Sequence, residues 1–229
     1  MKGNNLTQTT ETGVIKKVNP QIRHYIETEI LPQYHSLKGH TDQHIKDVIR
    51  RSFQIAQNLD GINLNMVYVI AAYHDLGRLV DNKTHHLESA KMLKSDQALK
   101  SFFTEAEIQT MAEAAEDHRA SLGHEPRSVY GKIVSCADRA TDISEPLARA
   151  YDYGKSLYPD WSEEDIIERA RLHLREKYSR NGYAVKTMYF QNPEFDEFIR
   201  KIEEITATKE KFYKIQVDFN NKRFKKENL

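Results

Sequence analysis

The fold of this chain is decided by one stretch, Val67-Tyr68-Val69-Ile70-Ala71-Ala72-Tyr73-His74-Asp75-Leu76-Gly77. The continuous apolar run, which starts after Asn63 and is closed by a polar doublet and a glycine, predicts a buried helix over about 63–73. His74 and Asp75 therefore lie where a buried helix ends. Imidazole and carboxylate together suit Zn, Mn or Fe better than Ca or Mg. The doublet predicts a metal site if other His and Asp residues converge on it.

The overall composition narrows the class of protein. The chain has 229 residues, with 34 Lys+Arg and 34 Asp+Glu, so its formal net charge is +0. A balanced chain has no global field that would gather nucleic acid or an anionic membrane, and we expect neither as a partner. Cys136 is the single cysteine, which excludes an internal disulfide and favours a reducing compartment. No apolar run approaches the length of a membrane span, and residues 1–8 lack a signal-peptide core, so we expect a cytoplasmic protein.

Helical periodicity runs along most of the chain and predicts an all-α fold. Thr104, with Glu107 three residues later, has the pattern of a capping box, and Pro32 is expected to stop the first helical run. Helices are expected from Pro20 to Pro32, from Thr41 or Asp42 to Asp60-Gly61, over about 63–73, from Thr84, from Thr104 to about His118, around 129–137, from Trp161 and from Pro193. A short strand near 183–189 is the one exception considered.

The chain divides by composition into three parts. Residues 1–13 are rich in Thr, Asn and Gln, and we expect a disordered leader. Residues 14–150 carry the His and Asp pattern and form the expected metal-binding core. Residues 151–229 form an expected helical extension packed on the core. Its basic tail, Lys222-Arg223-Phe224-Lys225-Lys226, is favoured as a solvated tail over a nucleic-acid contact.

Further His and Asp residues occur at the ends of these helices, where a bundle can bring them together. Taken singly, each has an ordinary explanation: a buried His is usually hydrogen-bonded, and Asp138 can pair with Arg139 or Arg119. Asp138 nevertheless adjoins a buried face, and an unpaired buried carboxylate is costly. The candidates, in chain order, are His44, His74, Asp75, His85, His86, His118 and Asp138.

The order of these residues resembles the HD superfamily of metal-dependent phosphohydrolases. The resemblance covers about residues 35–145 and implies an HD-domain helical bundle with a C-terminal helical extension. The segments that carry it are His44-Ile45-Lys46-Asp47-Val48, Ala72-Tyr73-His74-Asp75-Leu76-Gly77-Arg78 and Ser135-Cys136-Ala137-Asp138-Arg139. In such proteins the matching residues hold one metal ion, which assigns that ion to His44, His74, Asp75 and Asp138.

Some members of the superfamily hold a second ion, with the Asp of the doublet bridging the two. His85 stands four residues before Ser89-Ala90, which is similar to the His-x-x-x-Gly-Ala pattern of those members, with Ser in place of Gly. The resemblance thus implies His85 and His118 as ligands of a second metal, with His86 an alternative to His85. One or two ions of Mn, Fe, Zn, Co or Ni are expected, with Mg as an alternative. His40 is favoured as a substrate contact or a surface residue.

The implied activity is hydrolysis of a nucleotide or small phosphoester by metal-activated water. Asp75 and Arg78 are the expected catalytic residues; Arg78 stands where the family often has Lys, and a helix-end salt bridge is an equal alternative for it. Lys83 could add a second cation, and Asp47, Glu116 or Asp117 could orient the ligand imidazoles. An HD-type diiron oxygenase and a non-catalytic ligand-binding or regulatory protein are the competing readings. The expected partner is a small phosphorylated substrate, first of all a nucleotide. A homodimer is considered as an oligomeric state.

Overall fold

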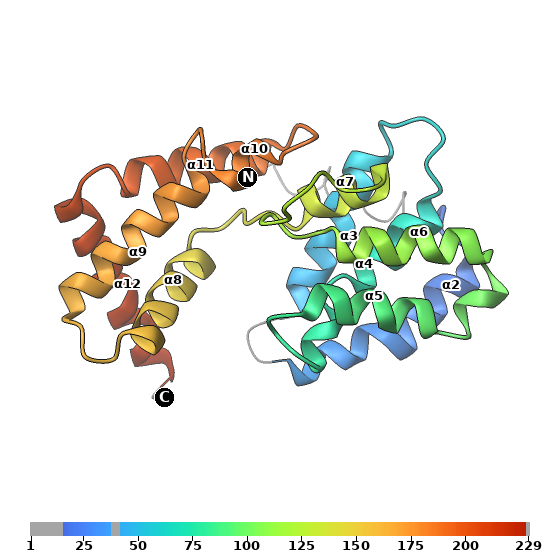
Figure 1. Cartoon of the computed structure of the whole chain (residues 1–229), viewed down its shortest axis with the longest axis horizontal. Helices are drawn as coiled ribbons and strands as arrows, with labels where there is room; N and C mark the ends of the chain where they lie inside the picture. Colours follow the sequence, from blue (N-terminus) through green and yellow to red (C-terminus); the bar gives the residue numbers. More distant parts are fainter. Residues whose placement is uncertain (1–15, 38–41, 228–229) are drawn as a thin grey trace, which may run out of the picture. The chain divides into compact units, whose positions relative to one another are not determined.

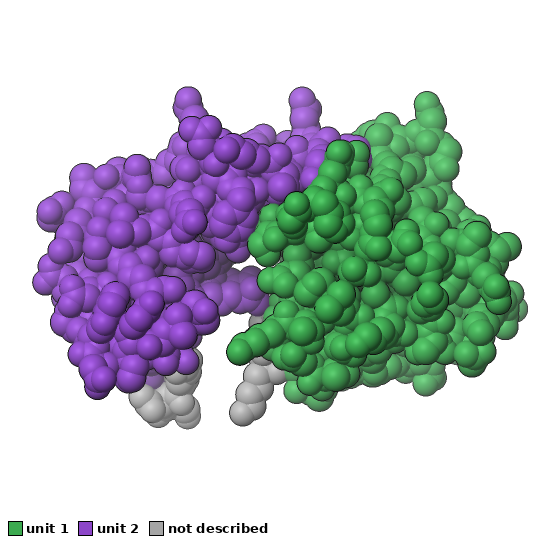
Figure 2. Space-filling view, viewed as in Figure 1, with its two compact units in different colours: residues 1–138 green, residues 139–229 purple. Residues whose placement is uncertain are grey.

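The computed structural model of the chain describes residues 16–37 and 42–227. These residues form helices and connecting turns, with no strand in the described part (Figure 1). The expected all-α fold is confirmed. The chain divides into two compact units, residues 1–138 and residues 139–229 (Figure 2). The expected leader over residues 1–13 and His40 lie outside the described residues, and the packing of the extension on the core stays a prediction.

The first unit is built around helix α4 (Leu64–Tyr73). Every side chain from Met66 to Tyr73 is buried, so α4 is apolar on all its faces and lies inside the bundle. Asn63 begins the helix by accepting a hydrogen bond from the backbone N–H of Asn65. The helices that pack against it are α3 (Asp42–Ala56), α5 (His85–Ser95), α6 (Glu105–Glu116) and α7 (Val129–Ala137).

The N-terminal helical run changes type as it approaches Pro32. It begins as α2 (Pro20–Tyr25), widens to a π-helix over Ile26–Ile30 and tightens to a 3₁₀ helix over Leu31–Ser36. A proline inside a helix lacks an N–H and clashes with the carbonyl four residues earlier, and the wider π turn is one way to relieve this clash. Pro32 therefore ends the wide helix, and the chain continues as a 3₁₀ helix.

Helices α5 and α6 run side by side and carry further histidines at their ends (Figure 1). Thr104 caps α6 with the expected capping box, in which its side chain and that of Glu107 each bind the other's backbone N–H. Between α4 and α5 lies a single 3₁₀ turn, η3 (Leu76–Leu79). This short connection keeps the end of α4 next to the start of α5.

The second unit contains α8 (Ser144–Leu157), α9 (Glu163–Tyr178), α10 (Tyr183–Lys186), α11 (Pro193–Ile205) and α12 (Lys209–Glu227). The short strand expected near 183–189 is wrong, because the chain there forms the helical turn α10. The backbone N–H groups of Val185 and Lys186 both donate to the carbonyl of Gly182, which satisfies them locally without a partner strand. Among the described residues, no helix combines the length and the apolar character that a membrane crossing requires.

Candidate metal centre

The centre begins where α4 ends. His74 still has helical backbone angles, whereas Asp75 leaves them with φ −109° and ψ 2° and starts η3. Because α4 is buried on all sides, its last residues are buried too: His74 is 0% exposed and Asp75 is 1% exposed. Two metal-binding side chains are thereby fixed inside the bundle, on a backbone that changes direction between them.

One group of side chains gathers around the Oδ2 oxygen of Asp75. His44 Nε2 and His74 Nε2 lie 4.0 and 3.8 Å from this oxygen. Asp138 approaches the same two rings, with its Oδ1 3.2 Å from His44 Nε2 and 3.5 Å from His74 Nε2. Residues from α3, the end of α4 and the end of α7 thus meet in one place, and we call these four residues the first group.

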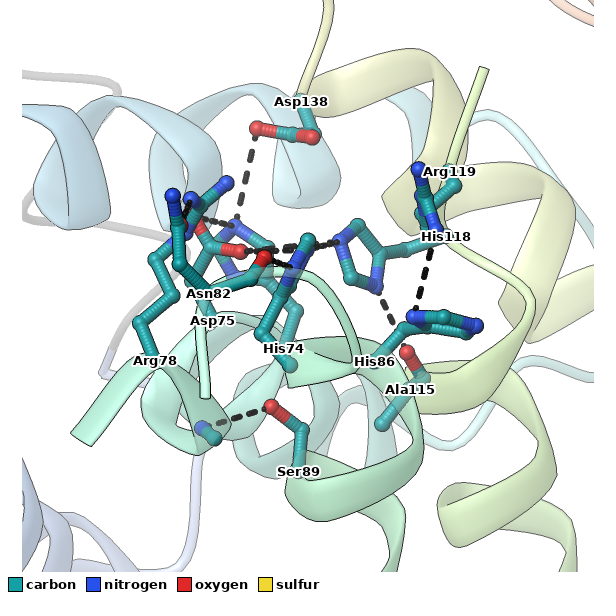
Figure 3. Close-up of polar contacts among 12 residues, drawn as sticks. His74, Asp75, Arg78, Asn82, His86, Ser89, Ala115, His118, Arg119 and Asp138 are labelled. Atoms are coloured by element: carbon teal, nitrogen blue, oxygen red, sulfur yellow. Dashed lines mark hydrogen bonds and ion pairs between the residues drawn. The ribbon is translucent and has the colours of Figure 1, made fainter. Parts of the chain in front are cut away.

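A second group gathers around the other oxygen of the same carboxylate. Asp75 Oδ1 lies 3.2 Å from His85 Nε2 and 3.6 Å from His118 Nε2. The two imidazole nitrogens are 3.3 Å apart. The second group therefore consists of Asp75, His85 and His118, and Asp75 is common to both groups. His86, the alternative to His85, has its Nδ1 3.5 Å from Arg119 NH1 (Figure 3).

The three buried imidazoles share one mode of orientation. In each, Nδ1 lies within hydrogen-bond distance of the backbone carbonyl three residues earlier, and a carbonyl only accepts, so Nδ1 carries the proton. The Nε2 atoms are then the ones that face the carboxylates. The contacts are His74 to Ala71 at 2.8 Å, His85 to Asn82 at 2.9 Å and His118 to Ala115 at 2.6 Å.

Main-chain carbonyls thus orient these rings, and the carboxylates expected for that task have other partners. Asp117 is fully buried, accepts from the backbone N–H of Arg127 at 2.7 Å and receives the Arg127 guanidinium at 2.8–3.2 Å. Glu116 lies 3.1 Å from the same guanidinium, and Asp47 Oδ1 lies 3.6 Å from Arg50 Nε. The Asp117–Arg127 pair ties the loop after His118 back to the end of α6.

The electrostatics of the cluster favour a bound cation. Burial alone would raise the pKa of both carboxyls, yet the neighbouring imidazoles hold the pKa of Asp75 and of Asp138 well below the ordinary value. Burial would likewise lower the pKa of His74, but the charges of Asp75 and Asp138 outweigh it and raise that pKa. Burial lowers the pKa of His85 to about 4, so its ring is neutral and offers a lone pair at Nε2.

The donor atoms fit a divalent metal ion. One donor atom from each of His44, His74 and Asp75 lies within 4.8 Å of the others, and the same holds for Asp75, His85 and His118. His74 Nε2 is buried and makes no hydrogen bond to a described residue. Imidazole nitrogens together with carboxylate oxygens are the donors that Zn, Mn, Fe, Co and Ni accept. The cluster could therefore hold a metal ion, and its identity stays a prediction.

Arg78 contacts the cluster through Asp75. Its Nε lies 2.8 Å from Asp75 Oδ2, and its NH1 donates to Asn82 Oδ1 (Figure 3). The guanidinium thus faces the first group and holds the carboxylate that both groups share. Its expected contact with phosphate stays a prediction. Lys83 is exposed in the turn before α5, where its backbone N–H donates to Asp81 Oδ1 at 2.9 Å.

Two residues to which the sequence assigned no contact of their own hold the doublet in place. The buried Tyr34 hydroxyl donates to the carbonyl of Ala72 at 2.8 Å, two residues before His74. The Ser89 hydroxyl accepts from the backbone N–H of Gly77 at 2.9 Å (Figure 3). Tyr34 lies in a segment without a motif, so nothing in its surroundings pointed to this contact. In the sequence, Ser89 was noted only as a small residue at the Gly position of the His-x-x-x-Gly-Ala pattern, and its hydrogen bond to Gly77 was not predicted.

Comparison with known proteins places the cluster in a family. Residues 41–141 match the HD domain, a stretch that contains all seven candidate residues from His44 to Asp138. No curated protein matches the chain, and no solved structure matches it either. HD domains bind divalent metals, which agrees with the donor set described above. The chain therefore contains an HD domain, at residues 41–141.

Proposed function

We propose that this protein is a metal-dependent phosphohydrolase that cleaves a nucleotide or a small phosphoester. The observation that carries the proposal is the position of Asp75, whose two carboxylate oxygens face two different pairs of histidines, at 3.8–4.0 Å on one side and 3.2–3.6 Å on the other. A carboxylate shared between two groups of imidazoles could hold two ions close enough together for two-metal hydrolysis.

Each residue would then have a defined task. His44, His74, Asp75 and Asp138 would hold one ion, and Asp75, His85 and His118 the other. Ions held there supply Lewis acidity and a bound water whose pKa lies near neutrality. The main-chain carbonyls behind His74, His85 and His118 keep the Nε2 atoms of these rings facing the carboxylates, where they would be ligands of an ion. Arg78 would keep Asp75 oriented and face the phosphate, since its guanidinium adjoins the first group.

The experiment combines metal content with a substrate screen. Protein loaded with Mn, Co, Ni, Fe, Zn or Mg is assayed against nucleotides and phosphoesters, and bound metal is counted by mass spectrometry. We expect Asp75→Asn to lose both ions and turnover, His118→Gln to lose the second ion and Asp138→Asn to lose the first. Asp60→Asn, which changes an exposed carboxylate in the same unit, is the matched control and should behave like the wild type.

The outcomes separate this function from its competitors. An Asp75→Asn variant that keeps its metal and its turnover would show that the cluster is not the active site. Oxygen consumption by the iron-loaded protein, without phosphate release from any phosphoester, would favour an HD-type diiron oxygenase. Bound metal with neither activity would favour a ligand-binding or regulatory HD protein.

A further inference from the structure

Arg119 differs from Arg78 and Arg127, which also lie near the metal centre, in having no acidic partner within 4.0 Å among the described residues. It directly follows His118 of the second group, and its side chain is half-buried. In the part of the chain that the structure describes, no carboxylate oxygen lies within 4.0 Å of it, and its polar neighbour is His86 Nδ1 at 3.5 Å from NH1. The guanidinium therefore lies beside His86, whose ring adjoins that of His85, and has no carboxylate within 4.0 Å among the described residues.

The neighbouring cations are already occupied. Arg78 lies 2.8 Å from Asp75, and Arg127 is held by Asp117 at 2.8 Å. A guanidinium carries five N–H donors in a planar fork, and the long contact with His86 uses at most one of them. The remaining N–H donors of Arg119 can bind a phosphoryl group in bidentate fashion, with two parallel hydrogen bonds to two of its oxygens.

His86 gives Arg119 its orientation. The His86 ring lies edge-on to the His85 ring, with centroids 5.7 Å apart, so it packs beside the second group without joining it. Its Nδ1 faces Arg119 NH1, and a ring nitrogen that receives an N–H acts as the acceptor (Figure 3). The ring and the guanidinium thus form a short chain of contacts that leads from the second group outward.

We infer that Arg119 binds the phosphoryl oxygens of the substrate beside the second group, with His86 as its positioning residue. The inference rests on the proposed function for its substrate class. It gives Arg119 a phosphate contact beside the second group, in addition to the one proposed for Arg78 beside the first group. Both residues come from segments flanking the second group: His86 follows His85 in α5, and Arg119 follows His118 after α6.

The test uses inorganic phosphate as the probe, on the full-length protein loaded with metal. Binding is measured by calorimetry, with metal content determined on the same samples. We expect Arg119→Gln to weaken phosphate binding by about 10- to 100-fold, the loss expected for a hydrogen-bonded charged group. The phosphate affinity of Arg119→Lys should lie between those of the wild type and Arg119→Gln, because lysine keeps the charge but lacks the planar pair of donors. All variants should keep their full metal content.

His86 is tested by a pair of variants that separates positioning from packing. His86→Asn keeps an acceptor oxygen that can face Arg119, whereas His86→Leu keeps the bulk and removes the acceptor. We expect His86→Asn to bind phosphate nearly as well as the wild type and His86→Leu to bind it several-fold more weakly. Arg180→Gln removes a guanidinium that is 90% exposed in the second unit, and it should bind phosphate like the wild type.

The results distinguish this inference from the proposed function. If the wild type hydrolyses phosphoesters and Arg119→Gln keeps both its phosphate affinity and its KM, the inference is wrong and the function stands. If phosphate binds and depends on Arg119 while no phosphoester is hydrolysed, the inference stands and the function is wrong. A metal-loaded wild type that binds no phosphate overturns the inference.

Discussion

The backbone N–H of Gly77 donates a 2.9 Å hydrogen bond to the Ser89 hydroxyl, and this contact joins η3 to the middle of α5. Ser89 is fully buried, and Gly77 lies two residues after Asp75. The contact therefore fixes the distance between the shared carboxylate and the start of α5, which carries His85. The geometry of the second group depends on how closely these two backbones approach.

Replacing Gly77 by Ala should disrupt this approach. A Cβ on Gly77 would lie 2.1 Å from the carbonyl oxygen of His85 and 2.5 Å from the backbone nitrogen of Ser89. Because both are backbone atoms, α5 must move, at a cost of about 1–3 kcal/mol in the free energy of unfolding. Urea unfolding and metal counting should show lower stability and loss of the second ion. Gly123→Ala, where an added Cβ meets nothing within 4 Å, should match the wild type.

Replacing Ser89 by Ala tests the hydrogen bond without adding atoms. The buried N–H of Gly77 would lose its acceptor, and an unsatisfied buried donor costs about 1–3 kcal/mol. We expect the urea midpoint to fall by a corresponding amount while the metal content stays closer to the wild type than in Gly77→Ala. Ser95→Ala, an exposed change at the end of the same helix, should be nearly neutral. Equal midpoints for the two serine variants would contradict the role given to Ser89.

Replacing Tyr34 by Phe should loosen the doublet from its other side. The Tyr34 hydroxyl donates to the carbonyl of Ala72 just before the doublet, and both residues are buried. We expect a loss of about 1–3 kcal/mol in the free energy of unfolding and a weaker affinity for the first ion, measured by competition with a chelator. The exposed change Tyr213→Phe serves as the control. An unchanged metal affinity would limit Tyr34 to a role in stability.

The stability of the protein should fall in alkali, and Tyr25 should account for part of the fall. The hydroxyls of Tyr25 and Tyr73 both donate to Asp96 Oδ2. Burial, reinforced by Asp96, raises the pKa of Tyr25 from 10.0 to about 12. The folded state thus holds this proton more tightly than the unfolded state.

The stabilisation from Tyr25 is complete below pH 10 and is lost as the pH rises from 10 to about 12. The slope for one proton is at most about 1.4 kcal/mol per pH unit. In urea unfolding measured on both sides of pH 10, the free energy of unfolding of Tyr25→Phe should decrease less with pH than that of the wild type. For Tyr213→Phe this decrease should equal that of the wild type. A Tyr25→Phe variant with the full alkaline fall would show that this contact does not contribute.

Features that depend on neighbouring residues in the chain were predictable from the sequence. The capping box of Thr104 and Glu107 is confirmed, because a helix cap is made within four residues. Helix α12 lies within the expected helical extension, but its bounds were not predicted, because the side chains it buries are partly polar. Phe212, Gln216 and Asn220 share one buried face, and Gln216 donates to Asn220 at 2.9 Å. A buried polar stripe does not appear in a hydropathy pattern.

The sequence by itself determined that the chain is helical, that α4 is buried, and that His74 and Asp75 lie at its end, because an apolar run closed by a polar turn has one stable placement. The tertiary structure decided which oxygen of Asp75 faces which histidines, and that Arg119 lies beside His86 without a carboxylate partner among the described residues. These relations join residues on different helices. They depend on how the helices pack, and spacing along the chain does not encode that packing.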